Sequence, residues 1–520
     1  MGDPQPTSNR IYDTYVRVLI LVAVSVGIFA RVYAFNNNPP GLNQDEASIG
    51  YEAWSLAFFG IDRNGVSWPV QLISWGDGQN VLYAWLAIPF IKILGLSIST
   101  TRLPMLISGL LSLPLVYRIG SRLFSVEAGL GALLFVALSP WHIMMSRWAL
   151  ESNLLPFVFV AGLAFAATQD QVKPWHWISA CAFWALCLYA YGVAYLSIPI
   201  FVLGAQVVFV RFRSISIKSA IAGSLVFIGV AAPVALFIAI NTFNWSSVSV
   251  AGLTVPHMPA TARFASQLNV SEVLVPNAMM LLRILIRQTD GYVYNSALPY
   301  GIMYSPVFFV LSLLFAISTV VCAITRSWPV QRMLIALWIF ACLPSGLVQI
   351  PNINRTNLLI MGLVVSAGLG VGLLERKFKG ILPLCAAALL VACGFFVRDY
   401  VTVQHDRIAP GFFDGLVPAL QYAQSKSSGN ICVTGNVNMP YIYALFTEQT
   451  DPNEFQRTVI YASQTSRTGF VASYGRYTFG LERCDYGAAS VILARTGDNM
   501  AGGLLGTKTS FGEYDVIVLK

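Results

Sequence analysis

The chain alternates between long apolar stretches and short polar turns over most of its length. Each of about eleven stretches approaches the roughly 20 apolar residues that a bilayer crossing needs. A further apolar stretch, 81–96, is shorter, contains Pro89 and carries Lys92. The pattern predicts a polytopic α-helical membrane domain over residues 1–397. The predicted spans are 16–34, 103–118, 127–145, 153–168, 176–191, 195–210, 219–240, 302–323, 331–349, 357–374 and 381–397.

The number of crossings decides on which side each loop lies. If 81–96 crossed the membrane, the basic clusters at 118–122, 211–218 and 376–379 would lie outside. If it does not cross, all three clusters lie in the cytoplasm, as the positive-inside rule favours. We therefore expect 81–96 to be an interfacial or re-entrant helix in the outer loop 35–102. The N-terminus is then cytoplasmic and the C-terminus extracytoplasmic, in a multi-pass protein of the inner or plasma membrane.

Residues 398–520 follow a different pattern. Charged residues and glycines become more frequent, and short β-like runs follow a helix-like stretch at 412–425. This mixture predicts a small extracytoplasmic α/β domain. Its two cysteines, Cys432 and Cys484, either form a disulfide in an oxidising compartment or stay free. The β-like runs are 431–434, 458–461, 490–493 and 515–519.

Composition supports the membrane class and excludes others. Apolar residues make up 56% of the chain and charged residues 11%, against about 25% charged residues in soluble domains. The net charge of +8 is therefore assigned to cytoplasmic Lys and Arg, not to nucleic-acid binding. The sequence has no P-loop, HExxH or GxSxG motif, so the usual signatures of ATP-driven transport, metalloproteases and serine hydrolases are missing.

The candidate acids lie in the predicted outer loops. Asp45 follows the first span, where a carboxylate in a partly dehydrated cleft can act as a general base; alternatively it caps a helix that begins near Ala47. Glu46 orients Asp45 or binds an acceptor; alternatively it is a solvated first-turn acid favoured by the helix dipole. Asp77 contacts substrate or metal, or simply forms a turn. Glu151 binds the acceptor, or pairs with Arg147 four residues earlier.

The candidate arginines lie on the same predicted side. Arg355 follows Asn352 and Asn354 at the outer end of a span, where its guanidinium can hold a phosphate with two hydrogen bonds or simply extend to the interface. Arg102 and Arg147 are similar candidates. His257, in the outer loop 241–301, is a weak candidate metal ligand, and a requirement for a divalent metal stays open.

Outer acids combined with outer arginines suit glycosyl transfer from a polyprenyl-phosphate sugar. The arginine holds the lipid phosphate that leaves, and the carboxylate activates the hydroxyl that attacks. One base suffices because phosphate is already a good leaving group, unlike the glycoside of a hydrolase, which needs a second acid.

The order of several short motifs resembles the superfamily of protein O-mannosyltransferases and lipid A aminoarabinose transferases. Members are membrane glycosyltransferases with the GT-C fold, and the resemblance covers most of residues 10–400. The matching motifs are Pro40–Glu46 in the first loop, Leu94–Pro104, Leu138–Glu151 and Asn352–Arg355, with a weaker match at Asp451-Pro452.

This resemblance implies an inverting transferase with Asp45 as base, Arg355 as a donor-phosphate contact and Glu151 at the place of a second-loop acid. It implies three partners: a polyprenyl-phosphate-linked sugar, a hydroxyl acceptor in the cell envelope, and membrane lipid. The chain has no room for the large luminal insertion of the eukaryotic mannosyltransferases, which favours a bacterial or archaeal member.

Two other functions remain open. A transporter or flippase for lipid-linked sugars would need charged residues deep within its spans and internal repeats, and neither is evident. A polysaccharide ligase or polymerase would share the outer arginines without requiring the early acidic pair. The sequence names neither the sugar nor the acceptor.

Overall fold

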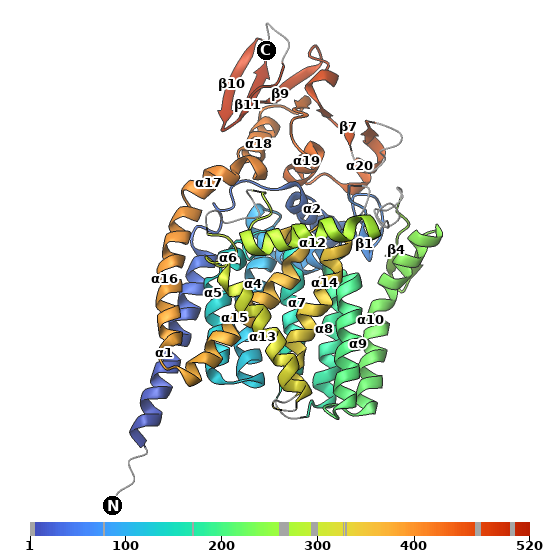
Figure 1. Cartoon of the computed structure of the whole chain (residues 1–520). Coiled ribbons are helices and arrows are strands. Elements are labelled where there is room, and N and C mark those ends of the chain that lie inside the picture. The colour runs from blue at the N-terminus through green and yellow to red at the C-terminus, as the bar shows by residue number, and fades with distance from the viewer. Residues whose placement is uncertain are drawn as a thin grey trace, which may run out of the picture.

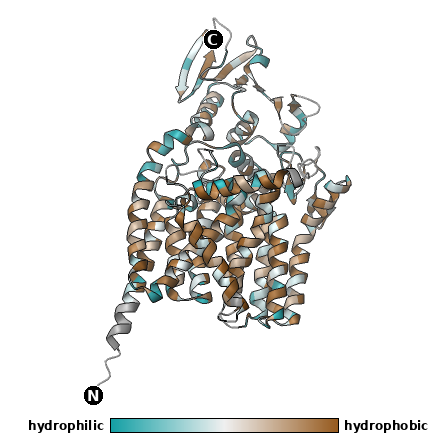
Figure 2. Ribbon diagram, viewed as in Figure 1, coloured by the Kyte–Doolittle hydropathy of each residue, from teal (hydrophilic) through white to brown (hydrophobic). Residues whose placement is uncertain are grey.

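The computed structural model is a bundle of long helices with a smaller mixed α/β domain above one end (Figure 1). The C-terminus lies in that domain, and the N-terminus lies at the opposite end of the bundle. Apolar residues dominate the bundle, whereas polar residues gather at its ends and in the smaller domain (Figure 2). The structure describes residues 6–75, 78–168, 171–258, 270–292, 300–325, 327, 330–462, 470–499 and 505–520.

Every predicted span overlaps a helix. Within the described residues, six helices are long and apolar enough to cross a membrane. The shorter apolar helices are Leu82–Leu94, Val126–Leu138, Glu151–Ala166, Val307–Cys322 and Met333–Val348. The polytopic helical class is therefore confirmed, while the count of about eleven crossings stays a prediction. The helices are α1 Pro6–Val32, α4 Ile98–Leu123, α5 Val126–Leu138, α6 Pro140–Met145, α7 Glu151–Ala166, α8 Pro174–Ala190, α9 Ala194–Arg211, α10 Ile217–Phe243, α13 Val307–Ile324, α14 Met333–Val348, α15 Ile353–Lys377 and α16 Ile381–Tyr400.

The centre of the bundle is the close contact between α5 and α15. Glycines make it, because a Cβ on Gly131 would overlap the backbone carbonyl of Gly368. In α15, 83% of the most apolar window is buried, so its N-terminal end is held rigidly where it meets the loops.

The stretch 81–96 forms α3, Leu82–Leu94, which follows α2, Gln44–Phe59, and a short hairpin of β1, Gln71–Leu72, and β2, Gln79–Asn80. The Tyr83 hydroxyl, at the start of α3, donates to the Thr101 carbonyl, 3.0 Å away near the start of α4. The Ser99 hydroxyl donates to Asn36, 2.7 Å away just beyond α1. Since the start of α3 and the first turn of α4 meet at one end of the bundle, the geometry supports the prediction that 81–96 does not cross.

The long loop between α10 and α13 contains a hairpin of β3, Val248–Val250, and β4, Leu253–Val255, followed by α12, Val270–Arg287. Helix α12 lies across the end of the bundle (Figure 1). Its Asn277 side chain donates to the Leu347 carbonyl at the end of α14, 2.7 Å away, which fixes the helix against the bundle.

The C-terminal domain is built on one mixed sheet, in the strand order β10-β11-β9-β5-β8-β7-β6. Strand β5 is parallel to both β9 and β8, and the other pairs are antiparallel. The strands are β5 Asn430–Val433, β6 Ile460–Tyr461, β7 Val471–Tyr474, β8 Tyr477–Phe479, β9 Ala489–Arg495, β10 Gly506–Phe511 and β11 Tyr514–Leu519, with α17 Val403–Ile408, α18 Leu416–Lys426, α19 Pro440–Glu448 and α20 Pro452–Thr458.

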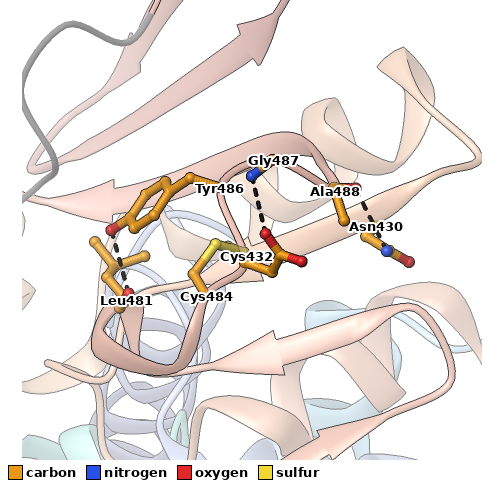
Figure 3. The surroundings of a disulfide bond; sticks show 8 residues. Asn430, Cys432, Leu481, Cys484, Tyr486, Gly487 and Ala488 are labelled. Atoms are coloured by element: carbon orange, nitrogen blue, oxygen red, sulfur yellow. Dashed lines mark hydrogen bonds between the residues drawn. A yellow bond between two sulfur atoms is a disulfide. The ribbon is translucent and has the colours of Figure 1, made fainter.

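The predicted α/β character of this domain is confirmed. Each of the four β-like runs overlaps a strand, and the helix-like stretch corresponds to α18. Cys432 and Cys484 form a disulfide with their Cα atoms 5.8 Å apart, which ties β5 to the loop before β9 (Figure 3).

Candidate active site

A cavity of about 640 Å³ opens where the bundle meets the C-terminal domain. Asp45 from the start of α2, Glu151 from the start of α7 and Arg355 from the start of α15 all line it. These three residues are far apart in the sequence, and the fold brings them to one space. The C-terminal domain contributes Asn438 and Met439 to the same lining.

Asp45 faces this cavity and does not cap its helix. Helix α2 begins at Gln44, and its N-cap is Asn43, whose side chain accepts a hydrogen bond from the Asp45 backbone N–H, 3.0 Å away. The interpretation of Asp45 as an N-cap for a helix starting near Ala47 is therefore wrong. Its carboxylate instead accepts a hydrogen bond from the Trp75 indole N–H, 2.9 Å away, which fixes its orientation.

A buried group of side chains supports Trp75 from behind. The Arg63 guanidinium lies 5.1 Å from the centre of the Trp75 ring and forms an ion pair with Glu52 at 2.8 Å. Arg63 also donates to the hydroxyls of Ser48 and Ser74, at 2.7 and 2.8 Å. Neither Trp75 nor Arg63 was predicted as a site residue: Trp75 lies two residues before Asp77, and no motif singles out Arg63.

Glu151 is the first residue of α7, in the turn before the predicted span 153–168. Its carboxylate accepts the Asn80 backbone N–H, 2.6 Å away, so the predicted pairing with Arg147 is wrong. Burial raises the pKa of Glu151 well above its usual value, and the charge of Asp45 raises that pKa further, against a smaller opposing effect of the Asn80 hydrogen bond. Both effects favour the protonated form of Glu151 beside Asp45.

Arg355 stands in the first turn of α15, whose N-cap Asn352 accepts the Arg355 backbone N–H at 2.8 Å. Its guanidinium donates to the Ile350 carbonyl, 2.9 Å away, and interacts with Tyr191, which also lies near Glu151 and Asp45. A helix N-terminus carries a partial positive charge, so this cavity wall combines a guanidinium with the positive end of a helix. Such a wall suits an anion, and a phosphate above all.

Glu46 lies behind the cavity and does not line it. It is fully buried and forms a two-armed ion pair with Arg102, at 2.8 Å for each arm. It also accepts the backbone N–H groups of Ala149 and Asn43, at 2.9 and 3.2 Å. These partners use its oxygens, so its contacts are structural, and the catalytic role of Glu46 stays a prediction.

The guanidinium groups of Arg102 and Arg147 are likewise hydrogen-bonded within the protein. Arg102 also donates to the carbonyls of Pro39 and Gly41, at 2.8 and 2.9 Å. Arg147 is fully buried and donates to carbonyl oxygens at the end of α1 and just beyond it. Neither arginine lines the cavity; both hold the loops around it, and their role as phosphate contacts stays a prediction. The acceptors of Arg147 are the carbonyls of Ala30, Arg31, Tyr33, Ala34 and Asn38.

The structure gives no support to a metal site on the candidate residues. Asp77 lies outside the described residues. The His257 ring interacts with the Asn244 side chain, 2.8 Å away, apart from the cavity lining. Among the residues that the structure describes, no group of three His, Cys, Asp or Glu side chains could hold a metal ion.

The fold and a family model point to the same class of protein. The model described as dolichyl-phosphate-mannose-protein mannosyltransferase matches residues 79–237. ArnT from Cupriavidus metallidurans in the apo state is similar with a TM-score of 0.61 at 12% identity, over 98% of both chains. The same protein bound to undecaprenyl phosphate gives 0.57 at 11%, over 97% of this chain and 98% of the other.

An oligosaccharyltransferase from Archaeoglobus fulgidus, in complex with Zn and sulfate, is similar with a TM-score of 0.53 at 11% identity, over 92% of this chain and 68% of that one. No curated protein matches the chain in sequence. Residues 79–237 thus match this mannosyltransferase family and the whole chain shares the fold of ArnT, in agreement with the predicted resemblance.

Proposed function

We propose that the protein is an inverting glycosyltransferase that moves a sugar from a polyprenyl-phosphate donor to a hydroxyl acceptor in the cell envelope. One observation carries the proposal: a hydrogen-bonded carboxylate, Asp45, and a guanidinium at a helix N-terminus, Arg355, line the same cavity. This is the pair of groups that such a transfer needs. The similar fold of ArnT, a protein with a structure bound to undecaprenyl phosphate, supports this class of donor.

In the proposed reaction, the donor phosphate binds Arg355 at the N-terminus of α15. Asp45 takes the proton from the acceptor hydroxyl, and the oxygen attacks the anomeric carbon from the face opposite the phosphate. The carbon–oxygen bond to phosphate breaks as the new glycosidic bond forms, and the configuration inverts. The phosphate keeps the bonding electrons, and Arg355 together with the helix end stabilises its charge.

Glu151 has a supporting role in this proposal. In the protonated form that its raised pKa favours, Glu151 can donate a hydrogen bond to a substrate oxygen, whereas an ionised Glu151 would place a second negative charge beside Asp45. This difference between the two carboxyl groups favours Asp45 as the base.

The cavity lies on the outer side of the membrane in this proposal, because that orientation leaves the three basic clusters inside. A Ser99→Cys variant without the eight native cysteines tests it with an impermeant thiol reagent on intact cells. We expect labelling without permeabilisation, since residue 99 lies at the cavity end of the bundle. Labelling only after permeabilisation would contradict this orientation.

The donor site is tested by Arg355→Ala, with binding of undecaprenyl phosphate to the reconstituted protein as the measurement. Charge-assisted contacts to phosphate contribute about 1.5–3 kcal/mol, so we expect affinity to fall roughly ten- to hundredfold. The matched control is Arg398→Ala, at the end of α16, where the side chain is 67% exposed. If Arg355→Ala keeps its affinity for the lipid phosphate and loses only acceptor binding, Arg355 belongs to the other substrate.

A further inference from the structure

The loop that joins β5 to α19, Thr434–Met439, occupies a special place in the C-terminal sheet. Strand β5 lies between two parallel neighbours, β8 and β9. From β5 the chain runs through α19 and α20 to the β6–β8 side of the sheet, and only later to β9 on the other side. In sheets of this kind, ligands bind beyond the carboxyl ends of the strands, at the point where the connections diverge. The Thr434–Met439 loop stands at that point.

A crevice of about 600 Å³ lies there, between this loop and the loop that follows β9. Its polar groups are held in place by their neighbours. Arg495 pairs with Glu513 at 2.8 Å, donates to the Asn436 carbonyl at 2.8 Å and lies 5.8 Å from the Tyr514 ring centre. The Asn436 amide is hydrogen-bonded to Asp498. The crevice is lined by Gly435, Asn436, Val437, Arg495, Thr496, Gly497 and Glu513.

The same loop also reaches the active-site cavity. Its last two residues, Asn438 and Met439, are part of the lining that holds Asp45. Met439 has a left-handed backbone, with φ of 52°, and is directly followed by α19. The ring of Tyr441 in α19 meets the ring of Trp75 edge to face, with centroids 6.2 Å apart. The loop is thus in contact, through α19, with the tryptophan that orients the base.

A smaller cavity of about 250 Å³ lies on the β6–β8 side of the same loop. Gly435, Val437 and Met439 form one of its walls, and Tyr441 and Phe479 contribute aromatic rings to it. The Thr434–Met439 loop therefore borders both the outer crevice and the cavity that holds Asp45. A ligand that contacts both spaces must be extended and not a single compact group.

We propose that the Thr434–Met439 loop is the acceptor-binding wall of the enzyme, and that the acceptor is a glycan chain that occupies the outer crevice while its reacting hydroxyl lies at Asp45. The inference rests on the proposed function and deepens it. Amide, guanidinium, carboxylate and hydroxyl groups are the side chains that hydrogen-bond to sugar hydroxyls. A peptide acceptor would instead favour a free sheet edge, but the edges of this sheet are β10 and β6, and the crevice lies beside its central strands.

The test uses a bulky substitution in the crevice and the same substitution elsewhere in the domain. Thr496→Trp places an indole in the crevice, while Thr507→Trp, on the edge strand β10, changes an equally exposed threonine outside it. The full-length proteins, in lipid nanodiscs, are incubated with an array of bacterial envelope polysaccharides. Because the indole would take the place of a sugar residue that hydrogen-bonds in the crevice, we expect Thr496→Trp to lose binding by at least about tenfold. The wild type and Thr507→Trp should keep it.

Binding of undecaprenyl phosphate is measured on the same samples. It should be unchanged in all three proteins, which shows that Thr496→Trp is folded. The proposal is overturned if Thr496→Trp binds the polysaccharides as the wild type does. It is also overturned if the wild type binds undecaprenyl phosphate but no polysaccharide, with a peptide or a lipid vesicle retained instead. Failure of the proposed function itself would look different, because the wild type would then not bind undecaprenyl phosphate.

Discussion

Two sets of charged residues lie at the same end of the bundle, and they differ in what their side chains contact. In the buried set, Glu46, Arg102 and Arg147 use their polar groups on one another or on backbone atoms. In the cavity set, which comprises Asp45, Glu151 and Arg355, the side chains line open space. Both sets contain acids and arginines from the same short motifs. Residue type and motif alone therefore do not show which of these residues hold the loops and which line the cavity.

The two sets separate because of local helix geometry. Asp45 and Glu46 are neighbours in the first turn of α2, so their side chains point about 100° apart. Glu46 turns back to the backbone of Asn43 in a capping box, and Asp45 points to the cavity. The buried set positions the loops that the cavity set needs, and the following predictions test this division of roles.

The largest expected effect is on the buried set. Arg102→Ala removes the partner of a fully buried Glu46, and an unpaired buried charge of this kind costs about 3–5 kcal/mol. We expect most of the folded protein to be lost, measured as yield and thermal unfolding in detergent, while Arg355→Ala unfolds like the wild type. If Arg102→Ala folds normally and loses only donor affinity, then Arg102 belongs to the cavity set.

Trp75→Phe tests the contact that orients the base. The substitution keeps an aromatic ring near Arg63 but removes the N–H that donates to Asp45. Hydrogen bonds to charged groups are worth about 1.5–3 kcal/mol, so we expect turnover to fall by at least about tenfold with unchanged donor binding. The matched control is Trp245→Phe, whose ring is 52% exposed. Unchanged turnover in Trp75→Phe would show that Asp45 is held in place without it.

Glu151→Gln is expected to have the smallest effect at neutral pH. Burial and the Asp45 charge raise the pKa of Glu151, so the wild-type side chain is neutral below that raised pKa, and glutamine imitates it. As pH rises through the raised pKa, Glu151 ionises beside Asp45 and wild-type activity should fall. The variant should keep near-normal activity at neutral pH and lack this alkaline decline. Turnover as low as expected for a missing base would make Glu151 the base.

Much of the fold could be predicted from the sequence, because long runs of apolar residues mark membrane helices. Each predicted span overlaps a helix, although the span 127–145 is divided between α5 and α6, and the switch to strand-like runs near residue 430 marks the sheet. Strands β7, β8 and β10 were not predicted. Strands β7 and β8 are only a few residues long, and all three are defined by pairing with neighbouring strands, not by an apolar run.

The candidate site could be predicted only in part. Asp45, Glu151 and Arg355 were named from loop position and motif order, and they do meet in one cavity. Trp75 and the Thr434–Met439 loop were missed, because their contribution depends on contacts between separate segments, 30 residues apart for Trp75 and Asp45. Glu46, Arg102 and Arg147 were named as site residues, but the structure places them behind the cavity. Burial of a polar side chain next to a loop motif leaves no signal in a single sequence.

The measurement that tests the central claim most directly is turnover by Asp45→Asn in purified, reconstituted protein, together with undecaprenyl phosphate binding on the same sample. Asparagine keeps the shape of the side chain and can accept the Trp75 hydrogen bond, but it cannot take the proton from the acceptor. A positioned base contributes about 10²–10⁴ in rate, so we expect turnover to fall by that factor with donor binding intact. The matched control, Asp485→Asn on the exposed surface of the C-terminal domain, should retain full turnover. Near-normal turnover by Asp45→Asn would contradict the account, because the base would then have to be another residue.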